Sequence, residues 1–121
     1  MKVFVYFNLH KKCFSIKALE GAMKGRVVAH RDNVLLFHTT FKVSQAGRER
    51  VLREKRKNVH AGVVGELIRT NVPLVHMPQM VSVTYNPYKY ESFVRKYNDF
   101  MPVNTAVWVH MGRDKSVEAI L

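Results

Sequence analysis

The chain contains a single cysteine, Cys13, and it has no long apolar stretch. One thiol cannot form an internal disulfide or a cysteine-based zinc site, so we interpret Cys13 as a small hydrophobic strand residue in a reducing cytosol. The apolar opening at residues 3–7 stops at Asn8, and no later stretch approaches the about 18 apolar residues that indicate a membrane helix. We therefore expect neither secretion nor insertion into a membrane.

Local patterns of metal sites and of catalysis are also absent. The six histidines show no HxH, HxxxH or HExxH spacing, and the chain has neither a glycine-rich phosphate loop nor a GxSxG motif. A metal-dependent nuclease needs clustered carboxylates, whereas most of those in this chain are scattered singly. We therefore expect no enzymatic activity, no cofactor and no metal.

Positive charge is what the chain has in excess. Twenty lysines and arginines stand against nine acidic residues, which gives a net charge of +11. Such an excess repels itself in the folded state, so it indicates a polyanionic partner. Binding to an anionic membrane surface would call for a long amphipathic helix with a lysine rim, which we do not find. Nucleic acid, RNA or DNA, is therefore the favoured partner.

The apolar pattern predicts one domain over residues 1–121, built from short strands and one helix. Ser44 is the expected N-cap of a helix over residues 45–57, and a bulge is expected near Thr39. The fold class is α+β, mainly antiparallel β: a strongly bent sheet or small barrel with one basic helix packed against it. Strands are predicted at residues 3–7, 13–16, 26–30, 34–43, 59–68, 80–85, 90–94, 105–111 and 116–121.

The predicted helix presents a row of cations. Residues 42–57 hold seven basic side chains and two carboxylates, so ion pairs within the helix cannot neutralise it. Helical spacing directs Val51 and Leu52 to one side and Arg50 and Arg53 to roughly the opposite side. A solvated face with internal ion pairs and a site for an acidic protein are the alternatives. The predicted phosphate contacts are Arg48, Arg50, Arg53, Lys55, Arg56 and Lys57.

Residues 85–96 interleave aromatic and basic side chains. Exposed Tyr88 and Tyr90 could stack on unpaired bases, which contributes about 1–3 kcal/mol per base. Alternatively, the rings fill the core at a hairpin, with the tyrosine hydroxyls at its rim. Stacking would favour single-stranded RNA or DNA over duplex. Tyr88, Lys89 and Tyr90 are therefore a second predicted nucleic-acid contact.

Three blocks of the chain resemble small basic proteins encoded by tailed bacteriophages. The blocks comprise KVFVY at 2–6, FKVSQAGR at 41–48 with RKNVHAG at 56–62, and TYNPY at 84–88. The resemblance implies a phage origin and action in the bacterial cytoplasm. Early phage genes often encode compact basic proteins that bind host DNA, RNA, ribosomes or enzymes. No catalytic residue is carried over from the family.

Two functions are consistent with these observations. The first is a non-enzymatic nucleic-acid-binding phage protein that contacts the phosphate backbone through the basic helix of residues 44–57. The second is a phage factor for host takeover that modulates a host or phage protein machine by binding its acidic surface. An exposed patch at Met77, Met80 or Phe100 would favour the second function. The choice between RNA and DNA and the oligomeric state stay open.

Overall fold

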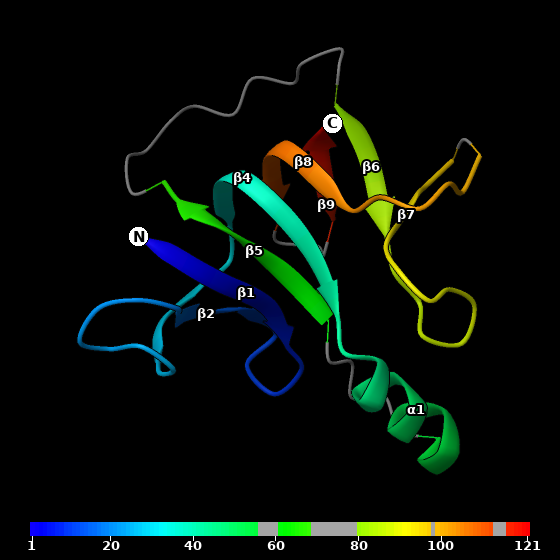
Figure 1. Ribbon diagram of the computed structural model, residues 1–121, viewed down its shortest axis with the longest axis horizontal. Helices are drawn as coiled ribbons and strands as arrows, with labels where there is room; N and C mark the ends of the chain where they lie inside the picture. Colours follow the sequence, from blue (N-terminus) through cyan, green and yellow to red (C-terminus); the bar gives the residue numbers. More distant parts are fainter. Residues whose placement is uncertain (56–60, 69–79, 98, 113–115) are drawn as a thin grey trace.

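A computed structural model of the protein describes residues 1–55, 61–68, 80–97, 99–112 and 116–121. These residues form nine strands and one helix (Figure 1). All of the strand pairings are antiparallel, which confirms the predicted α+β, mainly antiparallel β class. The elements are β1 (Lys2–Asn8), β2 (Cys13–Ala18), β3 (Val27–Arg31), β4 (Val34–Val43), α1 (Gln45–Glu54), β5 (Ala61–Leu67), β6 (Val81–Thr84), β7 (Val94–Arg95), β8 (Thr105–Met111) and β9 (Val117–Ile120).

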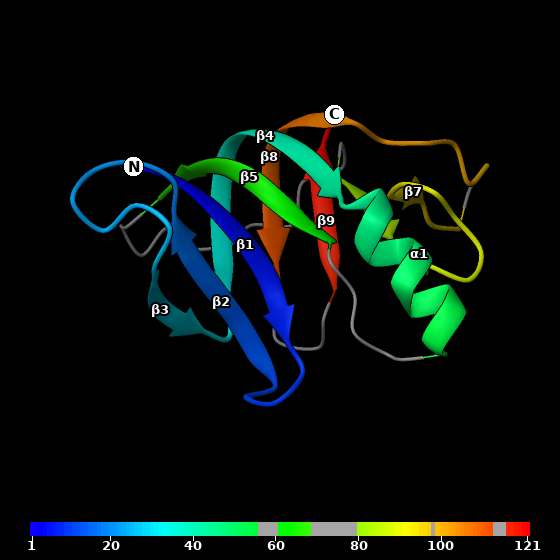
Figure 2. The same ribbon diagram turned by 60° about the horizontal axis from the view of Figure 1, so that its bottom comes forward.

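The described strands form one open sheet in the order β3-β2-β1-β5-β4-β8-β9-β6-β7. Its end strands, β3 and β7, do not pair with each other, so the sheet does not close into the small barrel that was one of the two expected shapes. Strand β1 pairs with β2 on one side and, on the other side, with β5, which follows α1 in the chain (Figure 2). Residues far apart in sequence therefore become neighbours on the sheet.

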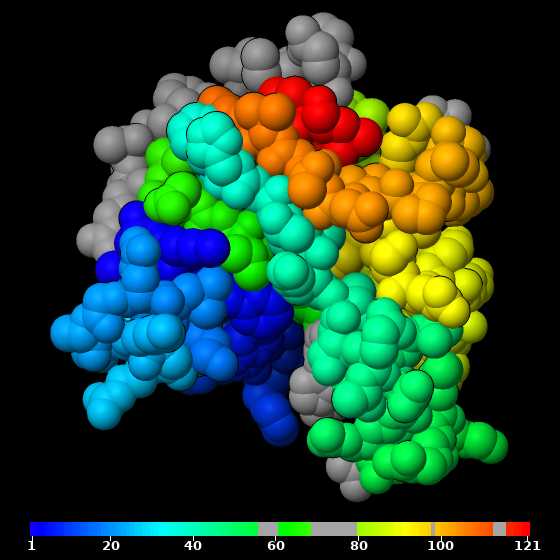
Figure 3. Space-filling view, in the orientation of Figure 1, coloured from blue at the N-terminus to red at the C-terminus, as the bar shows by residue number. Residues whose placement is uncertain are grey.

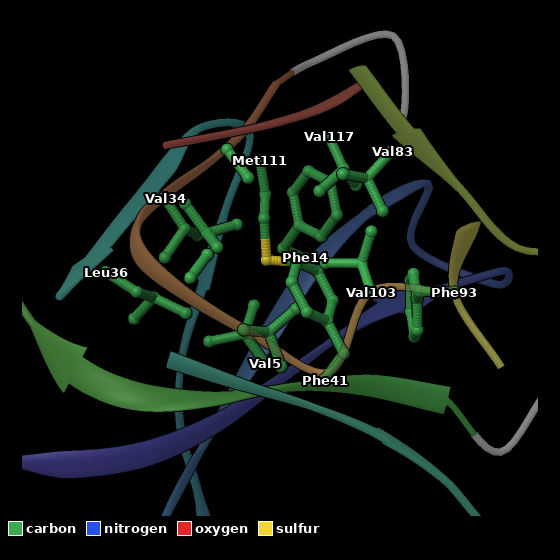
Figure 4. Packing of buried hydrophobic residues seen from close by; sticks show 14 of the residues in the cluster. Val5, Phe14, Val34, Leu36, Phe41, Val83, Phe93, Val103, Met111 and Val117 are labelled. Carbon is green, nitrogen blue, oxygen red and sulfur yellow. The ribbon is translucent and has the colours of Figure 1, made fainter. Parts of the chain in front are cut away.

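The hydrophobic core joins residues from both ends of this sheet. Phe14 of β2 and Val83 of β6 belong to one buried cluster, although five strands separate β2 from β6 in the sheet. Strands about 4.8 Å apart would place them roughly 30 Å apart on a flat sheet. The two ends therefore approach each other across the cluster, and Figure 4 shows Phe14, Val83 and Val117 pointing toward one another.

Strand β4 leads directly into α1. His38 has a positive φ of 49°, and the pairing with β5 shifts register between Phe37 and Thr40, which confirms the predicted bulge near Thr39. The Ser44 side chain accepts a hydrogen bond from the Gly47 N–H at 3.1 Å, as expected of an N-cap.

The helix ends at Glu54, earlier than the predicted residue 57. Lys55 is the C-cap in the left-handed conformation, with φ 53°, and its N–H donates to the Val51 carbonyl. This conformation closes the last turn and cannot continue an α-helix.

The strand predicted at residues 90–94 is shorter and begins later, because only Val94–Arg95 is a strand there, and it pairs with β6. The preceding segment is a turn that begins at Asn86. The Asn86 carbonyl accepts hydrogen bonds from the N–H groups of Lys89 at 3.0 Å and Tyr90 at 2.8 Å, and its side chain accepts from the Tyr88 N–H at 2.9 Å. Asparagine stabilises such turns by hydrogen bonding its own neighbouring backbone, which here outweighs the β propensity of the tyrosines. We call residues 86–91 the aromatic turn.

Candidate nucleic-acid interface

Arg48 links the helix to the aromatic turn. Its Nε donates to the carbonyl oxygens of Pro87 and Tyr90, both at 3.1 Å, and Gln45 Nε2 donates to the Glu91 carbonyl at 3.0 Å. Figure 3 shows the helix, in green, directly beside the aromatic turn, in yellow. The helix and the aromatic turn, about forty residues apart in the sequence, are thus in direct contact. Because its Nε is already engaged, Arg48 positions this surface and has less capacity left for phosphate than predicted.

The remaining described cations of the helix are solvent-exposed. Arg50, Arg53 and Lys55 are all exposed, whereas Val51 is buried, at 2% exposure. Neither Arg50 nor Arg53 forms an ion pair with another described residue, so the pairs that the spacing allows with Glu54 and Glu49 are not formed. Arg56 and Lys57 lie outside the described residues. The helix therefore presents charge that the described carboxylates leave uncompensated.

The tyrosines of the segment divide between the surface and the core. Tyr88 is 53% exposed and Lys89 is exposed, whereas the Tyr90 ring stacks on Phe100 with centroids 6.2 Å apart. Tyr85 packs beside the core residue Phe93, with centroids 5.3 Å apart. Burial raises the pKa of the Tyr85 hydroxyl above its ordinary value, and the positive charge of Arg48 opposes that shift. Tyr88 is thus the tyrosine of the aromatic turn best placed to meet a base.

A second exposed feature lies on the loop after β7. Tyr97 is 81% exposed, Phe100 49% and Met101 56%; we call these three residues the loop patch. Asp99 fixes this loop by accepting hydrogen bonds from the Arg95 guanidinium at 2.7 and 3.1 Å and from the Met101 N–H at 3.2 Å. Desolvation would raise the pKa of Asp99, but these hydrogen bonds and the positive charge of Arg95 together hold it below its ordinary value.

A groove that the sequence did not reveal lies on the face of the sheet opposite the core. Phe4, Tyr6, Lys17, Lys42 and Ser44 contribute to its lining, and its volume is about 950 Å³. From the apolar run at residues 3–7 we predicted only a strand. The alternation of valine with aromatic residues was the signal for two different faces.

Metal-binding clusters and membrane-spanning helices are both absent from the described residues. Within the described ranges, no group of three or more His, Cys, Asp or Glu side chains is arranged to hold a metal ion. None of the described helical residues belongs to a helix long and apolar enough to cross a membrane.

The role of Arg48 can be tested by Arg48→Met, which keeps an unbranched apolar stem and removes the donor. We expect the free energy of unfolding to fall by about 1–3 kcal/mol, because the carbonyls of Pro87 and Tyr90 lose a charged donor. Chemical denaturation measures the change. The matched control is Arg50→Met, at an exposed site, which should stay within about 0.5 kcal/mol of the wild type. Equal effects of the two substitutions would contradict the linking role.

Comparison with known proteins places the chain among bacteriophage proteins. A sequence profile of the family described as Mycobacterium phage L5 gene 82 protein matches residues 1–119. The Gene 82 protein of Mycobacterium phage L5 is 46% identical over 103 residues, which cover 78% of this chain and 77% of that protein. No solved structure matches the chain. The phage resemblance carried by the three sequence blocks is confirmed.

Proposed function

We propose that this chain, which belongs to the family of the Mycobacterium phage L5 gene 82 protein, is a non-enzymatic nucleic-acid-binding protein. It binds the phosphate backbone through α1 and acts in the cytoplasm of the infected bacterium. The observation that carries the proposal is the exposure of Arg50, Arg53 and Lys55, without described ion pairs, on a helix that contacts the aromatic turn with its exposed Tyr88 and Lys89, in a chain of net charge +11.

The position of these cations argues against a purely structural role. Arg53 lies in the last turn of α1, where a cation is stabilised by the helix dipole by about 0.3–1 kcal/mol. Arg50 lies before the last turn and gains little from that effect, and the two side chains repel each other. Guanidinium groups bind phosphate through two parallel hydrogen bonds, which offsets this repulsion when a nucleic acid is bound.

A salt titration of binding to labelled single-stranded RNA, single-stranded DNA and duplex DNA tests the proposal. If Arg50, Arg53, Lys55 and Lys89 each neutralise one phosphate, the logarithm of the affinity for a single strand should fall with the logarithm of salt concentration with a slope of about −3. We expect tight binding to one of the three ligands and resistance to heparin competition. Weak binding to all three, competed equally by heparin, would show that the charge is generic and would overturn the proposal.

A second candidate function is supported by the loop patch. It would make the protein a factor for host takeover that binds the acidic surface of a host or phage protein machine and modulates it. Of the residues expected to mark such a surface, Phe100 is exposed, Met80 is half-buried and Met77 lies outside the described residues. Large apolar side chains exposed on one loop, such as those of Phe100 and Met101, are a feature of protein interfaces. Saturable, stoichiometric binding to one protein that survives nuclease treatment would favour this function.

A further inference from the structure

Two aromatic rings lie side by side on the outer face of β1. Phe4 and Tyr6 share this face because residues two apart on a strand point the same way, while Val3 and Val5 are fully buried on the other face. The two ring centroids are 5.9 Å apart and the ring planes differ by 27°. The Phe4 ring lies above Gly62 of β5, where a side chain would leave no room for it. The strand pairing thus holds both rings in one half-exposed platform.

Cations flank this platform on both sides. Lys17 of β2 lies directly opposite Phe4 in the pairing, and Lys42 of β4 lies directly opposite Gly62. Both lysines line the groove with His10, and its described lining residues include no aspartate or glutamate. Neither lysine forms an ion pair with another described residue. The groove therefore combines aromatic surface with uncompensated positive charge, which complements a nucleic acid strand.

We infer that this groove is a stacking platform for the unpaired bases of a single-stranded nucleic acid. The inference rests on the proposed function and names its substrate class. Phe4 and Tyr6 stack on bases, and Lys17 and Lys42 bind the neighbouring phosphates. In a duplex the faces of the bases are stacked on one another and cannot contact the two rings. The bases of a single strand are free to stack on them. The groove reaches Ser44, the N-cap of α1, so a strand bound there continues along the exposed cations of the helix.

The test compares Tyr6→Leu with the wild type in binding a short oligouridine, a short oligothymidine and duplex DNA. Loss of one stacked base should lower the affinity for single strands by roughly 5- to 150-fold and leave duplex binding unchanged. Tyr97→Leu is the matched control, because it removes a tyrosine ring from an 81% exposed site outside the groove. The thermal melting midpoint of each variant shows that it folds.

The outcomes separate the inference from the proposed function. If wild-type protein binds none of the oligonucleotides, both the stacking platform and the proposed function are overturned. If it binds them and Tyr6→Leu behaves like Tyr97→Leu, or loses single-stranded and duplex binding equally, the platform is overturned while the function stands. Photo-cross-linking of an iodouracil-containing oligonucleotide to wild-type protein gives an answer that requires no variant to fold. Attachment at Phe4 or Tyr6 supports the platform, and attachment confined to α1 or the aromatic turn overturns it.

Discussion

Reversing two charges on the helix, by Arg50→Glu with Arg53→Glu, is expected to abolish nucleic-acid binding and to leave the domain folded. Hydrogen bonds to charged groups contribute about 1.5–3 kcal/mol each, so the loss of two phosphate contacts lowers the affinity by about 100-fold or more. Repulsion between phosphate and the new carboxylates adds to the loss. Because both side chains are exposed and glutamate is a good helix former, the melting midpoint should change little. Fluorescence anisotropy and circular dichroism measure the two quantities.

The matched control for this double variant is Arg31→Glu with Lys96→Glu. Both side chains are exposed, neither lies on α1 or among the described lining residues of the groove, and the control lowers the net charge of +11 by the same four units. It should lose only the long-range attraction, less than about tenfold in affinity at physiological salt, where screening acts over about 8 Å. Equal losses in the two double variants, or normal binding by the helix variant, would show that α1 is not the site.

Gly62→Ala is expected to destabilise the whole domain, by about 1–3 kcal/mol or more. A Cβ at this position would meet the Val5 carbonyl oxygen and would lie 2.7 Å from Cζ of the Phe4 ring, closer than real Cβ contacts occur. The ring can rotate, but the carbonyl belongs to the backbone of β1, and Val5 itself is fully buried in the core. Accommodating one methyl group therefore requires β1 and β5 to move apart. Thermal and chemical denaturation measure the loss.

The double variant Gly62→Ala with Phe4→Leu separates the two clashes. It relieves the contact with the ring and leaves the contact with the Val5 carbonyl, so we expect only part of the lost stability to return. A Gly62→Ala variant as stable as the wild type would show that β1 and β5 do not pack as closely at Gly62 as the Val5 carbonyl and the Phe4 ring indicate.

Most secondary-structure elements follow from local patterns in the sequence. The bounds of β4 and β8 agree with prediction, and the Ser44 cap sets the start of α1, because alternation and capping depend on residues only a few positions apart. The error in the strand predicted at residues 90–94 also has a local cause. There the hydrogen bonds of Asn86 to the following residues outweigh the preference of the tyrosines for a strand.

The sequence by itself determined the class of the fold, the net charge and the exposure of Arg50 and Arg53, because helical periodicity settles which side of α1 meets solvent. Only the tertiary structure decided that Arg48 joins the helix to the aromatic turn and that Phe4 lies over Gly62 between Lys17 and Lys42. These neighbours come from strand pairing and loop contacts between distant segments, which no local pattern specifies. The positive charge was therefore predictable from the sequence. The positions of the cations relative to the aromatic rings, at the aromatic turn and in the groove, were not.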